Sequence, residues 1–336
     1  MYNVSVSPHV RSQNTTKSVM RDVAIALLPV LAFGVYQFGL RALMVIAICI
    51  VTCVLSELIF ELLAKKTVTI FDYSAVVTGM ILAVNLPANV AWWIPVIGSV
   101  FAIVAVKMLF GGLGQNFMNP ALAARCFLLI SFTGRMSDFA TSGTLTEQFE
   151  MIKTGGIKAL TSAADATAGA TPLAVLKGGE EVDLLTLFLG FHGGCIGEVS
   201  ALAILIGGLY LIVKKVISVR IPLTYILSTA LFIFVINIAS GNDVSLNYML
   251  GQVLSGGLLV GAFFMATDYV TSPITPWGQI IYGILLGLLT ALFRVLGSSA
   301  EGVSYAIIIG NLLVPIIEKI TIPKPFGCEK AKGENK

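Results

Sequence analysis

Charged residues are scarce in this sequence. Only 12% of its 336 residues are Asp, Glu, Lys or Arg, while 57% are hydrophobic. Soluble domains contain about 25% charged residues and roughly 45–50% apolar ones. A water-soluble fold could not cover this much apolar surface with so few polar groups, which excludes an ordinary soluble enzyme. The mean hydropathy of +0.92 favours a protein whose outer surface faces lipid.

Metal-binding residues are few as well. The chain has two histidines and five cysteines. Cys49 and Cys53 are spaced to share one helix face, but no second pair completes a tetrahedral site. We therefore predict no metal site and no disulfide framework. The net charge is only +3, and no basic patch is interleaved with aromatic residues, so no nucleic-acid partner is expected.

Long apolar runs recur along the whole chain. A spanning helix needs about 20 consecutive apolar residues. The pattern predicts an all-α polytopic membrane protein with about ten transmembrane helices. The predicted spans are 23–40, 42–63, 68–86, 92–110, 119–133, 184–212, 221–240, 248–267, 278–295 and 302–319.

The third and sixth predicted spans are interrupted by glycine and proline. The third contains Gly79 and ends at Pro87, and the sixth contains Gly193, Gly194 and Gly197. Broken backbone is tolerated at membrane depth only where it faces protein or a cavity. Interrupted helices at matched places in two halves indicate a central site in transporter folds.

A long polar segment, 134–183, separates five predicted spans from five others. Five is an odd number, so the second set enters the membrane from the opposite side, as in an inverted repeat. We therefore predict an N-terminal tail and first five-helix repeat in 1–133, a second repeat in 184–320 and a C-terminal tail in 321–336.

Lysine and arginine gather on one side of this predicted topology, with Arg41 and Arg294 as exceptions. Cytoplasmic loops carry an excess of these residues. Both termini are therefore expected in the cytoplasm and segment 134–183 outside, with the chain in the cell (inner) membrane. The basic residues on the predicted cytoplasmic side are Arg11, Lys17, Arg21, Lys65, Lys66, Lys107, Lys214, Lys215, Arg220, Lys319, Lys324, Lys330, Lys332 and Lys336.

Several polar side chains lie in or beside the apolar segments. Ionised groups at membrane depth are costly and are usually functional. Arg125 and Glu198 are predicted either to pair with each other or to line an ion path. Asp268 is predicted to be either a solvated loop acid or a cation ligand. Asn116 and Asn119, at the start of the fifth span, either cap a helix or bind a ligand.

Three further polar residues are expected to be structurally ordinary. Glu57 and Glu61 lie near the cytoplasmic end of the second span, where we expect them to face water or Lys65. His192 stands beside the interrupted sixth span. A histidine with no partner ligands nearby in the sequence is expected to be packed or solvated.

The polar segment contains the run DATAGATPLA at 165–174. Gly169 permits a tight turn, and the alanines on either side of it leave the Thr171 hydroxyl little covered. Pro172 stiffens the backbone that follows. An accessible hydroxyl near a carboxylate suits transfer of a phosphoryl group onto threonine. A loop of small residues with no such role would have the same composition, so the residues alone leave both interpretations open.

This run resembles the flavinylation motif, Asp-x-x-Ser/Thr-Gly-Ala-Thr, of the Rnf and Na⁺-pumping NADH:quinone reductase complexes. Asp165, Gly169, Ala170 and Thr171 match the pattern, whereas Ala168 stands where Ser or Thr is usual. The resemblance implies that a flavin transferase attaches FMN through its phosphate to Thr171.

Further segments extend the resemblance over nearly the whole chain and point to the NqrB/RnfD family. The terminal extensions are short, which favours the Rnf D-subunit branch over the quinone-reductase branch. The matching segments, in chain order, are Ser7-Pro8-His9, Gly114-Gln-Asn116-Phe-Met-Asn119-Pro120-Ala121-Leu122 with Arg125, Gly197-Glu198-Val-Ser200, and Phe264-Met265-Ala266-Thr267-Asp268.

The resemblance implies a fold similar to urea transporters and a flavin-carrying role in a redox-driven ion pump. Electrons would pass between ferredoxin and NAD⁺, coupled to movement of Na⁺ or H⁺, with other Rnf subunits as partners. It also implies a second, non-covalent flavin, riboflavin, near Asn116, Asn119 and Pro120. No strand followed by GxGxxG is present, so nicotinamide chemistry and any catalytic residues are expected on another subunit.

Three alternatives remain open at the level of sequence. The inverted-repeat architecture also suits a channel or secondary transporter for a small solute, because fold does not decide function. The chain could instead be the NqrB subunit of a Na⁺-pumping NADH:quinone reductase, or a structural scaffold without a flavin.

Overall fold

The computed structural model describes residues 15–137, 139, 171–241, 245–297 and 302–323. Within these residues the regular structure is helical, apart from one isolated bridge. The first half contains α1 (Thr16–Phe38), α2 (Leu40–Leu63), the short 3₁₀ turn η1 (Ile70–Asp72), α3 (Ser74–Val84), α4 (Trp93–Val100) continued by the π-helical η2 (Phe101–Met108), α5 (Pro120–Ser131) and α6 (Thr133–Met136).

The second half begins with two short helices and then contains the longer ones. Its elements are α8 (Pro172–Lys177), α9 (Leu184–Leu189), α10 (Ala201–Val213), α11 (Arg220–Ala239), α12 (Leu246–Leu254), α13 (Leu258–Val260) continued by the π-helical η3 (Gly261–Met265), α14 (Pro276–Leu296) and α15 (Val303–Thr321).

Helix length separates these elements into two groups. Helices α1, α2, α11, α14 and α15 are long and apolar enough to cross a membrane. Helix α12 together with α13–η3 makes a sixth candidate span, bent by 55° at its break. Helices α3, α4–η2, α5 and α10 are apolar but shorter. Each of the ten predicted spans therefore contains a helix, but not each is a full-length spanning helix.

The shortened helices have local causes. Helix α3 ends at Val84, shortly before Pro87, and proline disfavours continuation of a helix past this point. Helix α5 begins at Pro120, with the Asn119 side chain accepting hydrogen bonds from the backbone of Ala121 and Leu122. The predicted sixth span, 184–212, is in fact α9, an irregular stretch and α10, because glycines interrupt it.

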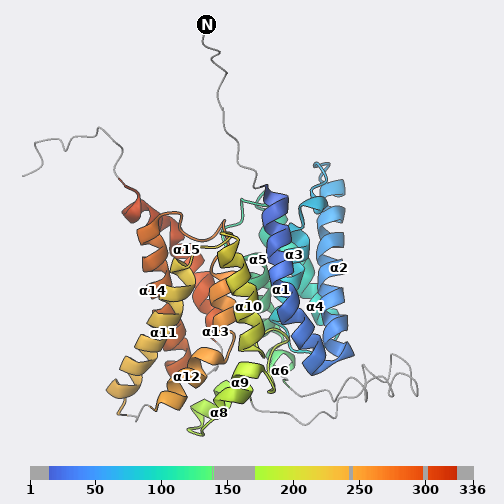
Figure 1. Ribbon diagram of the computed structural model, residues 1–336. Helices are drawn as coiled ribbons and strands as arrows, with labels where there is room; N and C mark the ends of the chain where they lie inside the picture. Colours follow the sequence, from blue (N-terminus) through green and yellow to red (C-terminus); the bar gives the residue numbers. More distant parts are fainter. Residues whose placement is uncertain (1–14, 138, 140–170, 242–244, 298–301, 324–336) are drawn as a thin grey trace, which may run out of the picture.

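The two halves stand side by side (Figure 1). The N-terminal end of α1 and the C-terminal end of α15 lie at one end of the molecule, called here the termini end. Helices α6, α8 and α9 lie at the opposite end, called the α8 end. Helix α10 lies against α1 and joins the halves, while α11 packs along α14 and α2 along α3.

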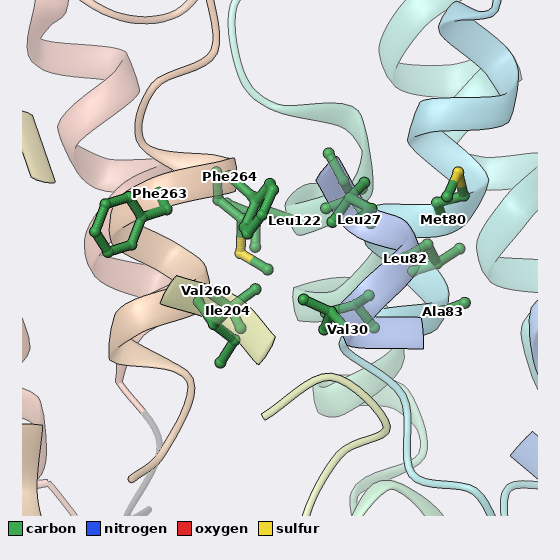
Figure 2. Close-up of a cluster of buried hydrophobic side chains, with 14 of the residues drawn as sticks. Leu27, Val30, Met80, Leu82, Ala83, Leu122, Ile204, Val260, Phe263 and Phe264 are labelled. Carbon is green, nitrogen blue, oxygen red and sulfur yellow. The ribbon is translucent and has the colours of Figure 1, made fainter. Parts of the chain in front are cut away.

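The core between the halves consists of aliphatic and aromatic side chains from both of them. Figure 2 shows Leu27 and Val30 of α1 with Leu82 of α3 on one side, and Ile204 of α10 with Phe264 of η3 on the other. Apolar side chains gain little hydrophobic free energy on leaving lipid, so van der Waals packing is the main attraction between membrane helices. This packing fixes the halves against each other.

The interrupted segments of the two halves meet at the centre. The backbone N–H of Ile196 donates to the carbonyl of Leu86 at 3.0 Å, and that of Gly197 donates to Val84 at 2.9 Å. Pro87 and Cys195 form the isolated bridge. The breaks predicted from glycine and proline are thus partners, and each satisfies backbone groups that the other leaves exposed at membrane depth.

Candidate functional site

A buried ion pair lies beside this crossing. The Arg125 guanidinium on α5 donates to the Glu198 carboxylate, with 3.2 Å between Nη2 and Oε1, and both side chains are about 5% exposed. Charges taken out of water are tolerated only with good geometry and further hydrogen bonds. Arg125 and Glu198 therefore form the ion pair that was one of the two roles predicted for them. We call this pair the central ion pair.

Arg125 gathers three more elements around the central ion pair. Its Nη1 donates to Asn85 at the end of α3 at 2.7 Å and to Ser304 on α15 at 3.0 Å. Its Nη2 lies 3.6 Å from the Cys195 sulfur. One guanidinium thus ties α3, α5, α15 and the segment before α10 together, a geometry that the planar five-donor fork of arginine favours.

Glu198 also faces a small cavity that contains Thr171, called here the Thr171 cavity. Thr171 caps α8, its hydroxyl accepting from the Ala174 backbone at 3.3 Å, and is half-buried. The cavity has about 240 Å³ of space, including its open part. Three of the residues that line it are glycines, which add no side chain to the wall. The lining residues are Thr171, Pro172, Leu173, His192, Gly193, Gly194, Glu198 and Gly256.

A larger polar cavity adjoins it at the α8 end. Leu173 lines both cavities, and this second one has about 1390 Å³ of space, including its mouth. We call it the polar cavity. Its side chains are mainly amides, hydroxyls and ions. They are Leu173, Leu176, Lys177, Glu180, Glu181, Asn237, Ser245, Asn247, Tyr248, Gln252, Arg294 and Val295, together with Gly178 and Gly179.

A third cavity opens near the termini end and collects the other predicted residues. Asn116, Asn119, Pro120 and Asp268 all line it, and it has about 770 Å³ of space, including its open part. We call it the Asn119 cavity. Most of the remaining wall is apolar and comes from α1, α3, α10 and η3, including the ring of Phe264.

Asn119 both caps α5 and lines the Asn119 cavity. Its Oδ1 caps α5, while its Nδ2 is 3.5 Å from the Met265 carbonyl at the end of η3. Asn116 donates to the Met118 carbonyl at 3.0 Å. The capping role predicted for these asparagines is present at Asn119, and it does not prevent the residue from facing a ligand.

Asp268 is half-buried in the loop after η3, and both roles predicted for it, a solvated loop acid and a cation ligand, stay predictions. It follows η3, and its Oδ2 accepts from the Thr271 hydroxyl at 3.1 Å. Burial raises the pKa of this carboxyl, and the hydrogen bonds from Thr271, Val270 and Tyr269 partly oppose that rise. An acid of this kind can bind a proton or a cation.

Comparison with known proteins identifies the family of this chain. Residues 3–327 match the model of the NQR2, RnfD, RnfE family. The chain belongs to this family. It is 49% identical to the D subunit of the Na⁺-translocating ferredoxin:NAD⁺ oxidoreductase complex of Acetobacterium woodii, over 99% of this chain and 98% of that one.

Two further relatives of the NQR2, RnfD, RnfE family are similar over their full lengths. One is the D subunit of the proton-translocating ferredoxin:NAD⁺ oxidoreductase complex of Clostridium ljungdahlii, at 37% identity over 98% of this chain and 97% of the relative. The other is the D subunit of the ion-translocating oxidoreductase complex of Actinobacillus succinogenes, at 35% identity over 97% of this chain and 98% of the relative.

The chain also contains a second buried ion pair, which the sequence did not lead us to predict. Lys107 on η2 contacts Glu57 of α2 at 2.8 Å and donates to the Ser74 hydroxyl at 2.6 Å. Glu61 accepts from the Thr69 backbone at 3.1 Å. Both glutamates are 1% exposed. The expectation that they face water or Lys65 is wrong, because α3 and η2 cover that face of α2.

A signal for this pair was present in the sequence. Lys107 lies within an apolar run, where a lysine without a counter-ion would be costly. A glutamate on another predicted span was the natural partner. Which helices are neighbours could not be told from the pattern of apolar residues.

Part of the flavinylation motif lies outside the described residues. Asp165, Ala168, Gly169 and Ala170 belong to this part, while Thr171 is the first described residue after it. Among the described residues, no group of three or more His, Cys, Asp or Glu side chains is placed to hold a metal ion.

Proposed function

We propose that this chain is the D subunit of an ion-translocating ferredoxin:NAD⁺ oxidoreductase complex and that it carries FMN on Thr171. The observation that carries the proposal is the 49% identity, over nearly the full length of both chains, to a subunit of that name. The names of all three relatives favour this assignment over a solute transporter and over a quinone-reductase subunit. The partners are the other subunits of the complex.

The surroundings of Thr171 fit a flavin phosphate ester. Its hydroxyl is half-buried beside the Thr171 cavity, whose glycines leave room at the backbone. The ester forms when a flavin transferase moves the flavin phosphoryl group from an activated flavin phosphate to the Thr171 oxygen, with loss of the hydroxyl proton and of the donor's leaving group. FMN, when bound, supplies the electron-carrying chemistry, and the protein supplies position and electrostatics.

The Asn119 cavity supports a second flavin, riboflavin. Its walls are largely apolar, with Phe263 and Phe264 near two asparagines. This combination, an apolar cleft with a few polar groups, is typical of ligand sites. The asparagine side chains could donate to and accept from the edge of a flavin ring. In this proposal the two cavities hold carriers toward opposite ends of the molecule.

The basic residues support an orientation with both termini in the cytoplasm. The loops and helix ends at the termini end carry most of the lysines and arginines, including the pairs at 65–66 and 214–215. Positive residues accumulate on the cytoplasmic side. Thr171 then lies on the outer side of the inner membrane, and 1–133 and 184–320 enter from opposite sides as inverted repeats.

The mass of the intact chain tests the flavin assignment. Purified from cells that contain the flavin transferase, the chain should carry the mass of one esterified FMN and fluoresce on a denaturing gel. Thr171→Ala should lose both signals. Thr186→Ala is the matched control, since the Thr186 hydroxyl in α9 contacts Asp183 and not the Thr171 cavity. An unmodified wild-type mass would reject the assignment and favour a scaffold or transporter.

A further inference from the structure

The polar cavity carries one further inference, which rests on the proposed attachment of FMN to Thr171. Arg294 of α14 lines this cavity and is 3% exposed. Its guanidinium donates to the carbonyls of Gln252, Ser255 and Gly256, where α12 breaks. These bonds hold the charged group in a fixed place on the cavity wall.

The path from Thr171 to this wall is short. Helix α8, which begins directly after Thr171, has six residues and is therefore about 9 Å long. Its Leu173, Leu176 and Lys177 form one side of the polar cavity. Gly256 packs closely at the boundary between the two cavities, where a Cβ would lie 2.8 Å from the Leu173 side chain and 2.9 Å from the Arg294 guanidinium.

The two cavities differ in volume, and the volume of each limits which part of the flavin it can hold. Most of the space in the Thr171 cavity is its open part, and only about 10 Å³ is enclosed, which is too little for a three-ring isoalloxazine. Without the open solvent at its mouth the polar cavity has about 600 Å³, within the roughly 300–1,000 Å³ of ordinary ligand pockets. The flexible five-carbon chain between phosphate and ring can connect the two.

The polar cavity also contains an acceptor that the described residues leave unused. The Asn247 Oδ1 atom is buried and has no hydrogen-bond partner among the described residues. A buried polar atom without a partner costs about 1–3 kcal/mol. That oxygen has no accessible surface, so a ligand in the cavity would meet the amide and hydroxyl groups of Gln252 and Tyr248 on the wall beside it. The pyrimidine ring of a flavin offers one N–H donor between two carbonyl acceptors, which such groups can bind.

We infer that the polar cavity receives the isoalloxazine ring of FMN attached to Thr171, and that Arg294 sets the reduction potential of this flavin. Reduction places negative charge on the ring unless a proton follows each electron. A fixed guanidinium nearby stabilises that charge and so raises the potential. The carboxylates of Glu180 and Glu181 are exposed, so water and salt screen their opposing effect.

The first test measures the potential of the Thr171 flavin in the purified complex, identified as the signal that Thr171→Ala removes. Arg294→Gln should lower the potential, and Arg294→Lys should restore much of it. A tenfold loss of preference for the reduced ring corresponds to 59 mV for one electron. Arg41→Gln is the matched control, because Arg41 is also buried but contacts Asn89, away from the cavity.

The second test does not depend on the stability of the Arg294 variants. Asn247→Trp should narrow the polar cavity, displace the flavin ring toward its mouth and raise quenching by iodide, whereas Leu246→Trp should not, because Leu246 is 77% exposed and does not line the cavity. Mass spectrometry should show FMN attached in every variant. Attached FMN with an unchanged potential in Arg294→Gln, or unchanged quenching in Asn247→Trp, overturns the inference while leaving the attachment intact.

Discussion

At the residue scale, the central ion pair makes the loss of one partner far more costly than the loss of both. Glu198→Gln leaves the Arg125 charge buried without its counter-ion. Removing one partner of a buried pair costs about 3–5 kcal/mol, whereas an apolar replacement of both is often neutral. We expect a large fall in the thermal stability of Glu198→Gln in detergent, and partial recovery in the double variant Arg125→Met/Glu198→Leu. Equal stability of Glu198→Gln and wild type would contradict this.

The second buried pair allows a comparison between two neighbouring glutamates. Glu57→Gln removes the counter-ion of Lys107 and should cost about 3–5 kcal/mol. Glu61→Gln keeps an oxygen that can accept from the Thr69 backbone, so about 1–2 kcal/mol is expected. Chemical unfolding of the two variants in the same detergent would measure the difference. The ranking would be refuted if Glu61→Gln were the less stable.

The residues differ in how far the sequence could predict them. Arg125 with Glu198 could be proposed as a pair because two opposite charges at membrane depth need partners. The cavity around Asn116, Asn119 and Asp268 could not, since it brings together residues about 150 positions apart in the sequence. In the sequence Arg294 stands out only as an exception to the charge bias, because its contacts depend on where α12 breaks.

At the element scale, close backbone approach between α2 and α3 depends on a single glycine. A Cβ on Gly79 would lie 2.8 Å from the Ile50 Cα and 3.0 Å from the Cys49 carbonyl oxygen. Neither is a flexible side-chain end, so α3 would have to move. Gly79→Ala should cost about 1–3 kcal/mol, as overpacking does. Gly134→Ala, where no atom lies within 4 Å, is the control and should melt like wild type in the same detergent assay.

Helix position was predictable and helix length was not. Hydropathy located a helix in each of the ten segments, because burial and lipid exposure both select apolar residues. Hydropathy alone could not set the ends of α3 and α10, although glycine and proline marked the interruptions beside them. Their backbone is satisfied by contacts such as Ile196 with Leu86, which join segments distant in sequence.

At the scale of the whole molecule, the fold places polar groups at two ends and an arginine between them. The Asn119 cavity opens toward the termini end, and the Thr171 and polar cavities lie toward the α8 end. Arg125 stands at the crossing between the halves. Its charge is balanced there by the Glu198 carboxylate, so the crossing holds a neutral, hydrogen-bonded ion pair.

The same two-ended arrangement predicts which residues can be reached from outside the cell. Four native cysteines are buried, so Cys328→Ser gives a background suited to labelling. In intact cells, a membrane-impermeant maleimide should label Glu181→Cys, which lies between α8 and α9. It should not label Lys65→Cys, after α2, until the cells are opened, because loops rich in basic residues are expected to face the cytoplasm. Labelling of Lys65→Cys in intact cells would invert the orientation and place Thr171 on the side of the soluble electron donors.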